Sequence, residues 1–174
     1  MRSFLVLVLL GGIICTFHGV LSRKLSDTGT LFSTSQQKRG GIVRAIKLFF
    51  GSLGYLKSIQ VKIGDEWSSK YGVPGGRESR IILYEGESII RVSGHGSLCI
   101  HEVEVETTAG RIFEFGKPVG TYFDDSIPQF NMELSGIEGL YGYICIKKLK
   151  CKWSYIPVNT TDIPQTAEAT VQTS

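Results

Sequence analysis

The sequence predicts an all-β domain built from short antiparallel strands. Glycine accounts for 21 of the 174 residues and proline for only 5, and β-branched and aromatic residues are frequent, as is typical of strands joined by tight turns. Strand-like segments recur roughly every eight to twelve residues. No window shows helical periodicity. These three observations favour a sandwich, a barrel or a prism.

Residues 1–22 are predicted to be a secretory signal peptide. A short basic start precedes the apolar core FLVLVLLGGIICTF, and Val20 and Ser22 suit cleavage after Ser22. The core is short for a membrane span, so we expect cleavage rather than retention as an anchor. No later stretch is apolar enough to cross a bilayer. The mature domain is therefore expected to be exported and to meet oxidising compartments.

Alternating apolar residues mark the strands of the domain. The clearest segment is residues 101–106, where Val103 and Val105 share one face while the glutamates share the other. We read the glutamate row as a solvated strand face. The segments expected to form strands are Ile42–Phe50, Tyr55–Ile63, Arg80–Tyr84, Ser88–Val92, His101–Glu106 and Arg111–Gly116.

Three cysteines remain after the leader is removed: Cys99, Cys145 and Cys151. An odd number favours one disulfide and one free thiol, with three pairings available. Cys99 and Cys151 each fall on the alternating positions of their strands that face inward, so a bridge between these two is sterically reasonable. Three buried free thiols are the alternative. No CxxC pair is present, and we expect neither a metal nor a cofactor.

The C-terminal residues 156–174 differ in composition from the domain. They are rich in threonine and nearly lack large apolar side chains, so we expect them to be disordered. Asn159 begins an Asn-Thr-Thr sequon, which is an N-glycosylation signal in an exported chain. The domain itself is predicted to occupy residues 23–155.

The stretch CIKKLKCKW, residues 145–153, places four lysines within six residues. On a strand, three of them form a solvated face opposite Leu149 and Trp153. Lys147 breaks this alternation, because it shares the parity of the buried residues. We therefore expect the strand to begin near Lys147, at the mouth of a glycine- and tyrosine-rich loop. The lysines on the solvated face are Lys148, Lys150 and Lys152.

Several motifs resemble those of the animal jacalin-related lectins. They are GYLKSIQVKIGDEW, GGRESRIILYEGESIIRVSG, GRIFEFGKPVGTYF and KKLKCKW, in the family's order and nearly its spacing, over roughly residues 25–155. The resemblance implies a β-prism, with three four-stranded antiparallel Greek-key sheets. It extends to exocrine secretory members of the family, which implies a secretory-granule route.

The resemblance also implies a sugar pocket at one end of the prism. Glycine-rich loops there present backbone amides to hydroxyls, and an aspartate accepts hydrogen bonds from a vicinal hydroxyl pair. This sequence places Lys147 where the family has that aspartate, and its first glycine loop is thinned. The residues implied to bind carbohydrate are Gly29, Thr30, Gly76, Arg77, Tyr141, Gly142, Tyr143, Ile144 and Lys147.

A lysine donates hydrogen bonds but cannot accept them. The preferred hypothesis is therefore a non-catalytic, secreted lectin for acidic or microbial-surface glycans. One alternative is a general polyanion binder that uses Lys148, Lys150 and Lys152 to grip glycosaminoglycan or granule matrix. Another is a secretory or signalling protein with an inactive sugar site. Each alternative predicts a different response to salt and to the choice of sugar.

Charge and motifs argue against other classes. The formal charge is +3, and removal of the leader with Arg2 leaves +2, far below the balance expected of a general nucleic-acid binder. No nucleophile, base and oxyanion group can be assembled from the motifs, so we do not expect an enzyme.

Overall fold

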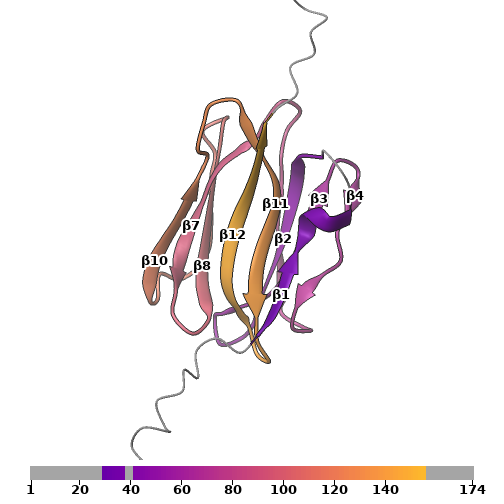
Figure 1. Cartoon of the computed structure of the whole chain (residues 1–174). Coiled ribbons are helices and arrows are strands. Elements are labelled where there is room, and N and C mark those ends of the chain that lie inside the picture. Colours follow the sequence, from indigo (N-terminus) through magenta and orange to yellow (C-terminus); the bar gives the residue numbers. More distant parts are fainter. Residues whose placement is uncertain (1–28, 38–40, 156–174) are drawn as a thin grey trace, which may run out of the picture.

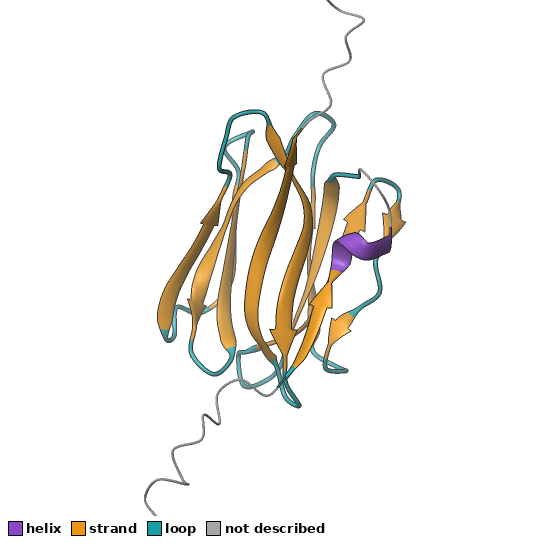
Figure 2. Ribbon diagram, viewed as in Figure 1, coloured by secondary structure: helices purple, strands orange, loops and turns teal. Residues whose placement is uncertain are grey.

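The computed structural model describes residues 29–37 and 41–155. The predicted leader, the predicted tail and Asn159 lie outside these residues. The described chain is almost entirely β-structure, with one short 3-10 turn (Figure 2). Its elements are β1 (Thr30–Ser33), η1 (Thr34–Gln37), β2 (Val43–Phe50), β3 (Leu56–Ile63), β4 (Glu66–Trp67), β5 (Tyr71–Gly72), β6 (Arg77–Ile82), β7 (Ile89–Gly96), β8 (Ile100–Thr107), β9 (Ile112–Gly116), β10 (Thr121–Ser126), β11 (Met132–Tyr141) and β12 (Ile146–Tyr155).

The strands form three antiparallel sheets around one core, in the manner of a β-prism (Figure 1). Sheet A has the order β1-β11-β12, sheet B the order β4-β3-β2-β6, and sheet C the order β10-β7-β8-β9, while β5 pairs with β3. Among the described residues the sheets thus contain three, five and four strands, where the sequence predicted four in each. Sheet B has five strands because the outer strand beside β3 is divided into two short strands, β4 and β5.

Strand alternation places the core where the sequence predicted it. Val103 and Val105 are buried on β8, while the intervening glutamates lie on the outer face and are half-buried. Each glutamate of that outer row contacts a neighbour on β7: His95 contacts Glu102 at 2.5 Å, Ser93 donates to Glu104 at 3.2 Å, and Arg91 pairs with Glu106 at 3.8 Å. The glutamate row is therefore a polar strand face held by its own cross-strand partners.

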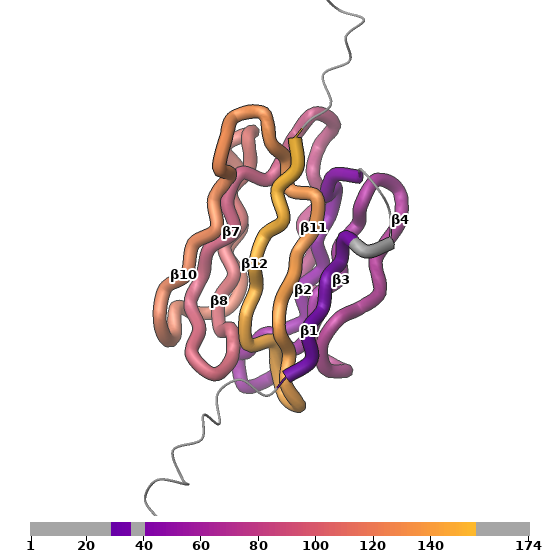
Figure 3. Tube along the Cα trace, in the orientation of Figure 1, coloured from indigo at the N-terminus to yellow at the C-terminus, as the bar shows by residue number. Residues whose placement is uncertain are grey.

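The loops that matter for function gather at one end of the prism. We call this the loop end; it comprises the turn at 51–55, the β7–β8 turn at 97–99, the β9–β10 turn at 117–120 and the β11–β12 hairpin at 142–145. It is the lower end in Figure 1, and the Cα trace in Figure 3 shows β1 starting beside the β11–β12 hairpin. The opposite end, called the far end, contains the β6–β7 and β8–β9 turns.

The disulfide corrects the pairing that we expected from parity. Cys99 bonds Cys145, with a Cα–Cα distance of 5.7 Å, and Cys151 remains free and buried. Cys99 and Cys145 both lie in loop-end turns, which the fold brings together, whereas Cys151 lies within β12 and its amide donates to Asp125 at 2.7 Å. Burial raises the pKa of the Cys151 thiol, and the charge of Asp125 raises it further.

A β-bulge explains the break in alternation at Lys147. Tyr141 pairs with Ile146 and Leu140 pairs with Lys148, so Lys147 is the extra residue on β12. The bulge reverses the parity of what precedes it, which is why Ile146 is fully buried although it shares the parity of the exposed lysines. The strand begins at Ile146, next to the predicted start.

Candidate functional site

The β11–β12 hairpin exposes its tip at the loop end. Its turn closes with a hydrogen bond from the Gly142 amide to the Cys145 carbonyl oxygen at 2.9 Å. Tyr143 is 98% exposed and Ile144 58% exposed at the tip. An exposed ring on a turn that a disulfide anchors is available for stacking on a ligand.

Lys147 lies at the base of this hairpin, where the bulge turns its side chain toward Gly142. A Cβ placed on Gly142 would lie 2.8 Å from Cε of Lys147. Lys147 is half-buried, so its aliphatic part is covered by the hairpin rather than by the core. The ammonium group is therefore at a glycine-lined rim of the prism.

The start of β1 lies against the same hairpin. Thr30 pairs with Tyr141, and a Cβ on Gly29 would approach the Tyr141 carbonyl oxygen to 2.7 Å. Only a residue without a side chain permits this close approach of two backbones. Gly29, Thr30, Tyr141, Gly142 and Lys147 thus lie around the same hairpin, and their role in binding carbohydrate stays a prediction.

A groove of about 900 Å³ continues from Gly29 along sheet A. It crosses β1, β11 and β12, and Tyr71 borders it from β5. Gly139 lets the ring of Phe32 and the Lys148 carbonyl oxygen pack against β11, because a Cβ there would lie 2.7 Å from the ring and 2.3 Å from the oxygen. The lining residues are Gly29, Leu31, Phe32, Ser33, Tyr71, Glu138, Gly139, Leu140, Lys148, Leu149 and Lys150. This groove is the larger of the hollows that open at the loop end.

The polar groups of the groove combine donors with one acceptor. Glu138 pairs in register with Lys150, and its Oε1 accepts a hydrogen bond from Ser33 at 3.2 Å and lies 3.9 Å from Nζ of Lys152. Lys148, Lys150 and Lys152 are exposed on the face that the sequence predicted. An anionic group could meet the lysines, and a hydroxyl could donate to Glu138.

Two of the predicted site residues lie elsewhere. Gly76 and Arg77 stand where β6 begins, and Arg77 borders a separate hollow between β6 and β9. The sequence resemblance had joined their loop to the sugar pocket. The fold separates them because β6 is the edge strand of sheet B, and the hairpin belongs to sheet A.

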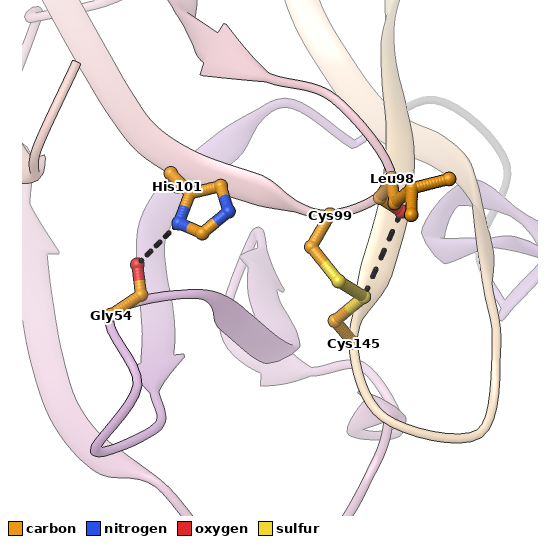
Figure 4. Close-up of a disulfide and its surroundings, with 5 residues drawn as sticks. All are labelled: Gly54, Leu98, Cys99, His101 and Cys145. Carbon is orange, nitrogen blue, oxygen red and sulfur yellow. Dashed lines mark hydrogen bonds between the residues drawn. A yellow bond between two sulfur atoms is a disulfide. The ribbon is translucent and has the colours of Figure 1, made fainter. Parts of the chain in front are cut away.

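The β7–β8 turn is the loop that sequence reasoning missed. The Cys99–Cys145 disulfide ties this turn to the hairpin, and Leu98 is 73% exposed beside it (Figure 4). The Leu98 carbonyl oxygen lies 3.9 Å from Sγ of Cys145. A disulfide sulfur carries no proton, so this is a van der Waals contact. The signal was present in the sequence: a cysteine follows Gly96-Ser97-Leu98 between two strands.

The comparisons with known proteins decide the family. Residues 21–150 match the model of the jacalin-like lectin domain. This chain belongs to the jacalin-like lectin family. A solved prostate-specific WGA16 glycoprotein lectin is 35% identical, with a TM-score of 0.68, over 73% of this chain and 91% of that one.

Among curated relatives of this lectin-family chain, human (Homo sapiens) zymogen granule membrane protein 16 is 31% identical over 74% of this chain and 76% of its own length. The prostatic spermine-binding protein of Rattus norvegicus is 29% identical over 90% of this chain, which spans about half, 54%, of that protein. The artocarpin structure solved with mannotriose is 19% identical with a TM-score of 0.59, and this likeness shows the fold alone.

No helix among residues 29–37 and 41–155 combines the length and the apolar character needed to cross a bilayer.

Proposed function

We propose that this jacalin-like lectin is a secreted, non-catalytic carbohydrate-binding protein that prefers acidic glycans. The observation that carries the proposal is Lys147, which is bulged out of β12 with its side chain over Gly142. It directly precedes Lys148, which lines the sheet A groove. A lysine there favours an anionic group, where a carboxylate would favour neutral vicinal hydroxyls.

The rest of the groove complements an acidic sugar. Lys148 and Lys150 line it with positive charge, and Glu138 accepts from a hydroxyl. Tyr143 lies outside this lining, exposed at the hairpin tip, where its ring covers the C–H face of a sugar that extends beyond the groove. The groove therefore offers each type of contact that a sugar bearing a sulfate, phosphate or carboxylate requires.

A glycan array tests the proposal when it is run at about 0.05 M and about 0.5 M salt, because salt screens charge attraction much more than directional hydrogen bonds. We expect selective binding of a subset of acidic glycans that survives at the higher salt. Lys147→Met, which keeps the length of the side chain, should abolish the preference for acidic over neutral sugars. Lys62→Met, at a surface lysine on β3, is the control. Absence of saturable binding to any glycan would contradict the proposal.

The outward lysines support a second candidate, general polyanion binding. Lys148, Lys150 and Lys152 are exposed on one face, but Lys152 donates to Ser35 at 3.2 Å and lies near Glu138. This local pairing weakens the charge that a long polyanion would meet. General polyanion binding predicts little sugar selectivity and a steep loss with salt, and equal sensitivity to all three lysines.

The name of the rat relative mentions spermine, a polycation. The acidic row of this chain on β8 already pairs with His95, Ser93 and Arg91 on β7. A polycation would have to displace these partners, so we do not propose spermine as a ligand of that face.

Export is proposed on the sequence of residues 1–22. Expression of the complete chain in a secretory cell line should deliver it to the medium with the leader removed after Ser22 and a glycan on Asn159. Mass analysis before and after enzymatic removal of N-glycans measures both. Retention of residues 1–22 would contradict cleavage.

A further inference from the structure

Each of the four turns at the loop end carries a large apolar side chain on its surface. Leu53 lies in the turn between β2 and β3, and Leu98 lies in the β7–β8 turn. Val119 lies in the β9–β10 turn, and Tyr143 lies at the tip of the β11–β12 hairpin. Their exposed fractions run from 50% for Val119 to 98% for Tyr143. Single exposed apolar side chains are common, but a set gathered at one end marks an interaction surface.

The charges at the same end are positive. The four turns, all within the described residues, read GSLGY, SLC, KPVG and GYIC and contain neither Asp nor Glu. Arg77, Lys117 and Lys148 are exposed around them, and Lys57 and Lys147 are half-buried. The apolar tips are therefore bordered by cations.

Carboxylates near this end lie on the strands behind the turns. Glu102 lies on β8, where it contacts His95 at 2.5 Å, and Glu114 lies on β9. At the far end, by contrast, Asp65 after β3 and Glu85 after β6 are exposed in turns. An anionic surface thus attracts the molecule with its loop end first.

The backbone of the four turns is paired internally, which lowers the cost of moving the tips out of water. Each turn contains an amide-to-carbonyl hydrogen bond of its own: from Gly54 to Gly51 at 2.9 Å, from Ser97 to Cys99 at 3.0 Å, from Val119 to Lys117 at 2.8 Å and from Gly142 to Cys145 at 2.9 Å. Figure 4 shows two further ties, the contact of His101 Nδ1 with the Gly54 carbonyl oxygen at 3.2 Å and the Cys99–Cys145 bond. Backbone groups that enter a lipid phase need such partners within the protein.

We propose that the loop end is a membrane-docking surface that inserts its apolar tips among anionic phospholipid headgroups. Leu53, Leu98 and Val119 enter the boundary between headgroups and acyl chains, and Tyr143 lies at headgroup level, where aromatic rings with a polar end are favoured. The surrounding lysines contact lipid phosphates. Insertion of this kind reaches only about 5 to 10 Å into the bilayer, so the protein lies on the membrane and does not span it.

A bilayer fits this surface better than a protein partner does. The tips come from four separate turns with cations between them, and a fluid bilayer accommodates such a surface without matching its shape. A protein partner has to supply a complementary, closely packed surface. Lipid docking is also independent of the sugar recognition proposed above, because neither Leu53 nor Leu98 lines the groove on sheet A.

Co-sedimentation of the exported protein with sugar-free vesicles tests lipid docking. Vesicles of phosphatidylcholine that contain about 30% phosphatidylserine are compared with vesicles of phosphatidylcholine alone. We expect saturable binding to the anionic vesicles and binding at least roughly fivefold weaker to the neutral ones. Leu53→Ser/Leu98→Ser should weaken binding to the anionic vesicles roughly tenfold, because two leucine side chains no longer leave water.

The far end supplies the matched control. Ile112→Ser/Phe130→Ser also removes two exposed apolar side chains without changing the charge, and it should leave vesicle binding unchanged. A depth measurement uses Leu98→Trp, whose fluorescence brominated phospholipid should quench. Phe130→Trp should gain no quenching over the unsubstituted protein, in which Trp67 and Trp153 supply the background.

Absence of binding to both kinds of vesicle, or equal losses in the two double variants, would overturn lipid docking. Binding that survives Leu53→Ser/Leu98→Ser but disappears at about 0.5 M salt would overturn insertion in favour of adsorption by charge alone. Self-association without vesicle binding, lost in the same variant, would assign the tips to a second copy of the chain. If vesicle binding holds while the glycan array shows no saturable ligand, only the proposed sugar recognition fails.

Discussion

The two ends of this prism are held together in different ways. At the far end, Glu87 is only 3% exposed, although it lies in a turn. It accepts hydrogen bonds from Arg111 Nε at 2.7 Å, from Thr107 at 2.5 Å and from the Tyr84 amide at 2.8 Å. At the loop end, one disulfide joins two turns whose large side chains stay exposed.

This difference separates stability from binding. At the far end the polar groups hydrogen-bond to one another, and neighbouring donors satisfy the carboxylate of Glu87. The loop end leaves Leu98, Tyr143 and Ile144 uncovered and keeps its backbone in place with a covalent bond. Loops fixed in this way can present side chains to a ligand without a large cost of ordering.

The largest expected effect is at the disulfide. Cys99→Ser/Cys145→Ser opens a loop with a sequence separation of 46 residues, which should cost about 3 to 4 kcal/mol of the free energy of unfolding. Denaturant unfolding measures the loss, and hydrogen exchange should rise first at residues 97–98 and 142–144. Cys151→Ala is the control, because it should retain one disulfide by intact mass. A bond between Cys99 and Cys151 in the unmodified protein would contradict the structure.

The far end should lose nearly as much from one side chain. Arg111→Met leaves the Glu87 carboxylate buried without its main partner and should cost about 3 kcal/mol. Arg80→Met breaks an exposed pair, in which Arg80 Nη2 lies 2.7 Å from Glu78, and should cost less than about 1 kcal/mol. Equal losses in the two variants, measured by denaturant unfolding, would remove the distinction between the network and an ordinary surface pair.

Acid should weaken the far end specifically. Hydrogen bonds from Arg111, which outweigh the opposing effect of burial, lower the pKa of Glu87 from 4.5 to about 2. The folded pKa lies below the unfolded one, so this stabilisation is complete above pH 4.5 and is lost as the pH falls toward 2. Denaturant unfolding curves recorded between pH 4.5 and pH 2 measure this loss of stabilisation. Arg111→Met should show a shallower dependence on pH, and an unchanged slope would contradict the assignment to Glu87.

The smallest effect on stability is expected at the hairpin tip. Tyr143→Ser removes a ring that touches little of the protein and should change the free energy of unfolding by less than about 0.5 kcal/mol, while glycan binding falls. Tyr71→Ser removes a ring stacked 5.1 Å from Phe32 and should cost more, roughly 2 kcal/mol. Loss of stability without loss of binding in Tyr143→Ser would show that the tip has a structural role.

Sequence patterns predicted most of the strands but not their grouping. The alternation at 101–106 located the two inward valines of β8 correctly, because local parity depends only on the pleat. Parity failed next to Lys147, where the bulge placed Ile146 in the core. A bulge depends on the partner strand, so one strand's sequence does not reveal it.

The candidate site was predicted in part for the same reason. Gly29 and Lys147 lie at the same hairpin because β1 pairs with β11, a pairing that the sequence analysis did not predict. Arg77 was assigned to the wrong neighbourhood, and the β7–β8 turn was overlooked. Both depend on which sheet edges face each other, and that is set by long-range packing.

By itself, the sequence determined the class of the fold and its family motifs, because local alternation and the order of the motifs carry this information. The tertiary structure decided which cysteines pair, that Glu87 is buried, and that the cations divide between a groove on sheet A and a hollow between β6 and β9. Those outcomes depend on contacts between residues far apart in the chain, and such contacts form only when three sheets close around one core.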